Sequence, residues 1–209
     1  MSQTITRLFD DYTDATTAVS QLEALGISHG DISIVANNAH GHHAAGDHES
    51  VNDHGDVSRG TSTGALLGGA GGLLAGLGLL AIPGLGPIVA AGWLAATVAG
   101  AGIGAAGGAA TGSLVGALKN SGHTDEDANV YSEGVRRGGT LVSAKVPDAQ
   151  VTAVQAVLDG NSSVDATTRG AAYRQSGWTS FDADAPAYTI DEVDRERATY
   201  ARTPAVERY

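Results

Sequence analysis

The sequence predicts an α+β protein in which two βαβ halves join as one antiparallel sheet around an inserted glycine-rich helical hairpin. Three observations carry this prediction. Residues 4–35 and 140–167 each combine strand and helix patterns. Between them, Thr61 to Leu118 form a block of 58 residues without Lys, Arg, Asp, Glu or His. After residue 169 no hydrophobic period persists, which is typical of a disordered tail.

The first half begins with a strand, because residues 4–9 alternate apolar and polar positions. Asp14 is a suitable N-cap for the helix that follows, and Gly26 ends it. Residues 31–35 then predict a second strand. The helix is expected from apolar residues at helical spacing: Ala15, Ala18, Val19, Leu22 and Leu25.

Two glycine ladders with a spacing of four residues dominate the uncharged block. Residues spaced by four lie on one helix face, so each ladder forms a smooth stripe. Glycine within a helix costs about 1 kcal/mol relative to alanine, so the stripes make sense where another backbone packs closely. The ladders are Gly60, Gly64, Gly68, Gly72 and Gly76, then Gly92, Ala96, Gly100, Gly104, Gly108, Gly112 and Gly116. The expected helix-packing residues are Gly64, Gly68, Gly72, Gly76, Gly100, Gly104, Gly108, Gly112 and Gly116, and the expected turn is Pro83, Gly84, Leu85, Gly86 and Pro87.

The second half starts with a short polar helix over residues 125–137, capped by Thr124 and ended by Gly138-Gly139. A strand over 140–146, a helix over 148–158 and a last strand over 163–167 follow. The two halves suit a ferredoxin-like layout, a four-stranded antiparallel sheet with two helices on one face. The predicted segments are 1–35 (first half), 36–59 (His/Asp-rich linker), 60–119 (hairpin), 120–169 (second half) and 170–209 (acidic tail, disordered or weakly helical near 191–201).

Several segments resemble small bacterial general-stress proteins of the YflT-like, low-temperature-induced group. The similar segments are Leu8-Phe9-Asp10, Gly26-Ile27, 31–35, 81–87 and 131–139, within a resemblance that covers about residues 4–168. The Pro-Gly-Leu-Gly-Pro turn together with Glu-Gly-Val-Arg-Arg-Gly-Gly is its most specific part. The resemblance implies a stress-induced protein without an established enzymatic activity, and it carries over no catalytic residue.

The uncharged block allows two forms of assembly. Residues 60–82 would make about 34 Å of helix, enough to cross a bilayer core of about 30 Å. Arg59 and Lys119 would then flank a transmembrane hairpin with both termini in the cytoplasm, at the inner membrane. The second predicted helix is rich in Ala and Gly and too long for one span, which favours instead a soluble homo-oligomer packed through the glycine stripes. A hairpin buried within a monomer is the third alternative.

Composition and motifs argue against several classes of function. The net charge of −11 disfavours binding to nucleic acid, and the absence of cysteine excludes disulfides and thiolate chemistry. No nucleophile motif or phosphate-binding loop is present, because Gly68-Gly69-Ala70-Gly71-Gly72 follows no strand pattern and precedes no Lys-Ser/Thr. Arg136 and Arg137 fit a helix dipole, surface ion pairs or lipid headgroups. We therefore expect no enzyme and no cofactor.

Five histidines lie among carboxylates in the linker: His40, His42, His43, His48 and His54. Imidazole and carboxylate groups can bind Zn²⁺, Ni²⁺ or Cu²⁺. The spacing has no helical support, so a hydrophilic linker is the simpler interpretation and metal binding the alternative. The function expected is a non-enzymatic, self-associating and membrane-associated stress protein. The alternative is a soluble ligand- or metal-sensing module that forms a homo-oligomer, with no small-molecule ligand identified.

Overall fold

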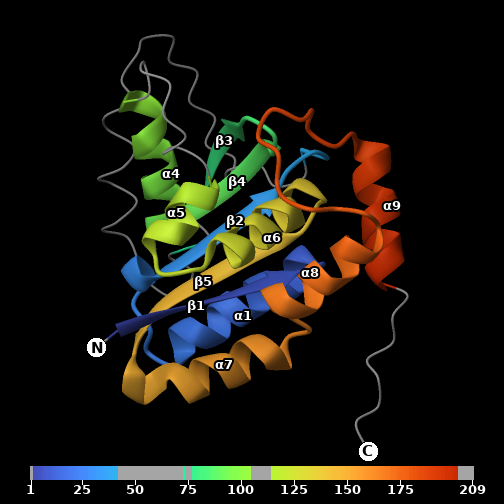
Figure 1. Ribbon diagram of the computed structural model, residues 1–209. Helices are drawn as coiled ribbons and strands as arrows, with labels where there is room; N and C mark the ends of the chain where they lie inside the picture. The colour runs from blue at the N-terminus through green and yellow to red at the C-terminus, as the bar shows by residue number, and fades with distance from the viewer. Residues whose placement is uncertain (1, 42–72, 74–76, 105–113, 202–209) are drawn as a thin grey trace, which may run out of the picture.

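The computed structural model describes residues 2–41, 73, 77–104 and 114–201 (Figure 1). The strands are β1 (Ser2–Phe9), β2 (Ile32–Asn37), β3 (Gly78–Ile82), β4 (Gly86–Gly92) and β5 (Thr140–Pro147). The helices are α1 (Tyr12–Ala24), α4 (Trp93–Gly104), α5 (Leu114–Asn120), α6 (Asp125–Arg136), α7 (Val151–Gly160), α8 (Ala166–Gln175) and α9 (Ile190–Ala201), with 3-10 turns η1 (His29–Asp31) and η3 (Asp148–Gln150). The predicted α+β class is confirmed.

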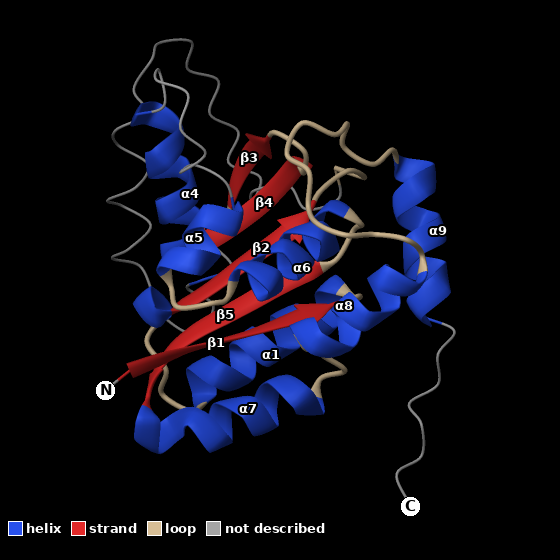
Figure 2. Cartoon of the chain, viewed as in Figure 1, coloured by secondary structure: helices blue, strands red, loops and turns tan. Residues whose placement is uncertain are grey.

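The five strands form one antiparallel sheet in the order β1-β5-β2-β4-β3, with helices on both faces (Figure 2). Side chains alternate between the faces along each strand. Ile34 and Phe9 belong to the core cluster that includes α1 and α7, and Val35 and Leu8 belong to the cluster that includes α4, α5, α6 and α8. Because both faces are covered, β2 is buried along its whole length.

Local capping explains where the helices begin. The side chain of Asp11 accepts a hydrogen bond from Thr13 N at 2.6 Å, so α1 begins at Tyr12 and the predicted cap at Asp14 is wrong. Asp14 lies instead in the first turn, where its negative charge favours the helix N-terminus. The predicted cap Thr124 is confirmed, since its hydroxyl accepts from Asp127 N at 3.1 Å.

The residues on either side of the predicted turn are strands, so the expectation of a helical hairpin is wrong at its centre. β3 and β4 pair from Gly78 opposite Ala90 to Ile82 opposite Gly86. The glycine period of four breaks between Gly76 and Gly92, and short apolar runs fill this gap. A short apolar run such as 88–91, which is buried on both faces of the sheet in β4, has the same pattern in a strand and in a helix, so periodicity does not distinguish the two.

Most of the predicted glycine stripe lies outside the described residues: Gly60, Gly64, Gly68, Gly72, Gly76, Gly108 and Gly112. Gly100 and Gly104 lie in α4, Gly116 lies in α5, and Gly92 ends β4. Residues 78–82 are strand, so a transmembrane helix over 60–82 is wrong at that end. Across the described part of the chain, no helix has the length and apolar character needed to cross a membrane.

Two predictions near the C-terminus are also wrong. In place of a strand over 163–167, Val164 makes one bridge to Leu8, and the side chain of Asp165 caps α8 by accepting from Thr168 N at 2.7 Å. In place of a disordered tail, residues 170–201 complete α8 and form α9, with Tyr173 and Val193 buried. The weak helix expected near 191–201 corresponds to α9.

His123 gives the fold a testable pH dependence. Its Nε2 lies 2.7 Å from the Thr6 hydroxyl, and burial lowers the pKa of His123 below 6.5, an effect that Asp127 offsets only in part. The folded protein therefore binds this proton less readily than the unfolded chain. Its contribution to stability is complete above pH 6.5 and falls as pH decreases from there toward the lowered pKa.

We predict that His123→Phe flattens the fall in stability below pH 6.5. The difference in unfolding free energy between the two proteins should change by at most about 1.4 kcal/mol per pH unit. Urea unfolding of both proteins between pH 7.5 and 5 measures this difference, and the other histidines cancel because both proteins contain them. Parallel curves over that range would contradict the assignment.

Candidate interaction surface

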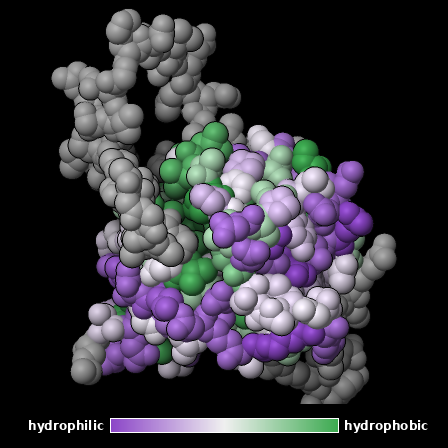
Figure 3. Space-filling view, turned by 45° about the horizontal axis from the view of Figure 1, so that its top comes forward, coloured by the Kyte–Doolittle hydropathy of each residue, from purple (hydrophilic) through white to green (hydrophobic). Residues whose placement is uncertain are grey.

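The edge strand β3 presents an uncharged surface. In the described part of the chain β3 pairs with β4 alone. Leu80 packs against the core, whereas Leu79, on the opposite face of the strand, is 63% exposed. On the face shown in Figure 3, apolar side chains gather in a green patch among hydrophilic ones. An exposed apolar edge strand without a charge, a proline or a bulge is prone to pair with another chain.

The opposite edge of the sheet is protected. Leu8 of β1 exchanges two backbone hydrogen bonds with Val164, at 3.0 and 2.7 Å. Arg7 of the same strand donates to Asp159 at 2.8 Å, which places a charged pair beside this edge. Charges and a covering segment are two devices by which proteins block edge pairing. The two edges therefore differ, and β3 is the one suited to association.

The predicted turn packs beneath the C-terminal segment. Gly84 and Gly86 have φ of +74° and +80°, values that favour glycine. A Cβ on Gly84 would lie 2.8 Å from Ala183 Cα, and one on Gly86 would lie 2.8 Å from Ala187 Cβ. Glycine is therefore favoured at both positions for two reasons: the turn needs positive φ, and residues 182–187 leave no room for a Cβ.

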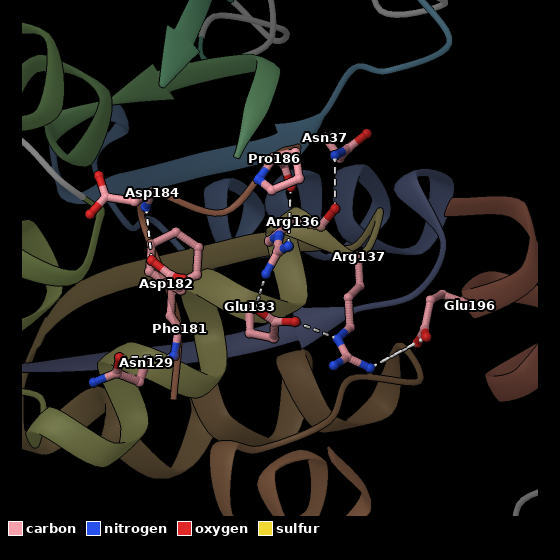
Figure 4. Close-up of polar contacts among 10 residues, drawn as sticks. All are labelled: Asn37, Asn129, Glu133, Arg136, Arg137, Phe181, Asp182, Asp184, Pro186 and Glu196. Atoms are coloured by element: carbon pink, nitrogen blue, oxygen red, sulfur yellow. Dashed lines mark hydrogen bonds and ion pairs between the residues drawn. The ribbon is translucent and has the colours of Figure 1, made fainter. Parts of the chain in front are cut away.

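A buried carboxylate fastens the same C-terminal segment to α6 (Figure 4). Glu133 is 1% exposed and accepts hydrogen bonds from Arg137 Nε at 2.7 Å and Arg136 Nη1 at 3.3 Å. Arg136 then donates to the carbonyl of Pro186 at 3.1 Å, and Arg137 donates to Glu196 at 3.3 Å. Burial by itself would lower the pKa of Arg137, but pairing with Glu133 outweighs burial, so that pKa is raised. Arg137 stays charged at all accessible pH.

Aromatic rings add contacts between the end of α6, α8 and α9. The guanidinium of Arg137 lies 4.3 Å from the ring centre of Tyr173, and that of Arg169 lies 3.9 Å from the ring centre of Tyr200. Arg169 also donates to Asp10 at 2.6 Å. Such cation–π contacts contribute about 0.5–2 kcal/mol each. The sequence interpretation of Arg136 and Arg137 included surface ion pairs but missed this cluster, although Glu133 lies three and four residues before them.

The histidine-rich segment is described only at its start. His40 Nε2 lies 2.9 Å from Asp194 Oδ1 in α9, while His42, His43, His48 and His54 lie outside the described residues. Within residues 2–41, 73, 77–104 and 114–201, no three potential ligands come together as a metal site. His40, the one described histidine of this segment, thus contributes to the contact between α9 and the segment after β2.

Comparison of the chain with protein-family models, curated proteins and solved structures finds no match. The resemblance to general-stress proteins therefore stays a prediction from the sequence segments that carry it.

We predict that Glu133→Gln destabilises the protein strongly. The variant removes the carboxylate between Arg136 and Arg137 and leaves their charges partly buried, a change that typically costs about 3–5 kcal/mol. The control is Asp159→Asn, which breaks the pair between Arg7 and the exposed Asp159 and should cost less than about 1 kcal/mol. Urea unfolding gives both values, and equal losses would show that Glu133 has no special role.

Proposed function

We propose that this chain is a non-enzymatic general stress response protein that self-associates through residues 60–119, which contain the uncharged block 61–118, with β3 as the contact strand. The carrying observation is the exposed apolar edge at Leu79. A second copy of the chain is the partner that fits, because a strand paired antiparallel with itself makes an isologous contact around a two-fold axis.

The energetics favour such pairing. The outer N–H and C=O groups of the five-residue strand would gain ladder hydrogen bonds, and Leu79 would leave water in both copies. Full burial of a leucine side chain contributes about 1.5–3 kcal/mol. The symmetry of the contact doubles each such gain. The glycine-rich residues on either side of the hairpin would extend the contact, as the small-residue packing argument expects.

The ferredoxin-like interpretation belongs to the same proposal. The order β1-β5-β2, with α1 and α7 in one core cluster, suits two βαβ halves. Val164 lies beside β1, where the fourth strand of that layout would run. The β3–β4 hairpin would then extend the sheet at the β2 edge, which makes the inserted segment the outermost strand and gives it access to a partner.

The absence of catalysis is proposed on chemical grounds. The charged side chains between the body and α9 neutralise one another as ion pairs, notably Glu133 with Arg136 and Arg137, and Arg169 with Asp10. Groups held in this way stabilise structure and are poorly placed to transfer a proton.

Attachment to the cytoplasmic side of the inner membrane is the second candidate function. The 58 uncharged residues and the exposed Leu79 support it, and Arg59 and Lys119 flank the block. An alkaline carbonate wash of membranes from expressing cells separates the two candidates. Retention in the pellet supports attachment, and release as a soluble oligomer supports assembly alone.

We predict that Leu79→Lys disrupts the oligomer, because it places a charge at the centre of the proposed contact. Leu25→Lys is the matched control, since Leu25 is also exposed, at 42%, but follows α1 away from β3. Light scattering coupled to size-exclusion chromatography measures the mass of each protein. The wild type and Leu25→Lys should share one oligomeric mass, and Leu79→Lys should elute as a monomer.

Two results would contradict this proposal. A monomeric wild type at all concentrations would exclude self-association. An unchanged mass in Leu79→Lys would show that β3 is not the contact strand.

A further inference from the structure

A polar groove lies between the start of α6 and the segment that follows α8. Its volume is about 390 Å³, within the range of small-molecule sites. The groove is lined by residues of α6, of α8 and of the segment after α8: Asp125, Glu126, Asn129, Arg174, Trp178, Thr179 and Ser180. It is separate from β3 and from the cluster around Glu133.

The charged groups that line the groove are held in ion pairs. Arg174 pairs with Glu126, and Asp125 pairs with Lys119, which is not one of the lining residues. The lining therefore presents two carboxylates and one guanidinium. A phosphorylated or otherwise strongly charged ligand would have to break one of these pairs, whereas a neutral ligand can use them as hydrogen-bond donors and acceptors. The charge pattern thus favours an uncharged, polar ligand.

Trp178 adds an aromatic surface to this polar lining. Tyr173 packs edge-on against the indole, with ring centres 5.6 Å apart and an interplanar angle of 67°, which fixes the ring. The indole Nε1 is closed to solvent, so Trp178 contributes aromatic surface to the groove and not a hydrogen-bond donor.

We propose that this groove binds a neutral polyhydroxylated ligand of one or two sugar rings. The C–H faces of a sugar pack on an aromatic ring, and its hydroxyls both donate and accept hydrogen bonds. Trp178 supplies the ring, Asp125 and Glu126 supply acceptors, and Arg174 supplies donors. The proposal is independent of self-association, since no groove residue lies on β3.

Tryptophan fluorescence tests the proposal on the full chain. The sequence contains two tryptophans, Trp93 and Trp178, so Trp93→Phe leaves Trp178 as the single reporter. Titration of this protein with glucose and with trehalose should give a saturable change in emission for at least one of them. Free N-acetyltryptophanamide, titrated in parallel, corrects for the effect of sugar on the solvent.

Two further variants locate the binding site. Arg174→Gln in the Trp93→Phe protein should weaken binding about tenfold, and Arg195→Gln, an exposed arginine of α9 outside the groove, should leave it unchanged. Calorimetry of Trp178→Phe should show loss of the binding heat. If neither sugar gives a saturable signal, or if Arg174→Gln and Trp178→Phe bind as the wild type does, the proposal is overturned.

Discussion

The carboxylate of Glu133 is the group on which the attachment of the segment around Pro186 and of α9 depends. It is buried at the end of α6 between two arginines, and each arginine passes the attachment onward, Arg136 to the backbone at Pro186 and Arg137 to Glu196. A buried charge is tolerated when it is paired, and the two ion pairs with Glu133 hold both arginines in place. Their guanidinium groups donate to the Pro186 carbonyl and to Glu196, and they also pack against tyrosine rings. Figure 4 shows how one carboxylate organises this set of contacts.

The elements that the sequence predicted well carry their own signals. Alternation identified β1 and β5, and Thr124 as a cap identified the start of α6. The turn at 83–87 was found from proline and glycine, but its strands were not. A run such as 88–91, buried on both faces, has no period that separates a strand from a helix. Tertiary context decided between them, because β4 pairs with β2.

The C-terminal region could not be predicted for a different reason. Its stabilising contacts are single residues far apart in sequence, such as Val193 against Gly138 and Tyr200 over Arg169. No hydrophobic period arises from contacts of this kind. The candidate contact strand could be predicted only in part. The uncharged block, residues 61–118, indicates an association segment, but only the sheet order places Leu79 on an edge.

The C-terminal segment links the hairpin to the polar groove. Residues 182–187 pack on Gly84 and Gly86 in the turn, Phe181 N donates to Asn129 Oδ1 at 3.2 Å, and Trp178 lines the groove. One stretch of ten residues, 178–187, therefore contacts the base of the proposed contact strand and the proposed ligand site. Contiguity alone does not produce coupling, which requires a segment with two arrangements. The close glycine contacts instead favour one arrangement, because a shift of the segment would open gaps at both glycines. On these grounds the segment acts as a fixed brace, and association and ligand binding should be independent properties of the chain.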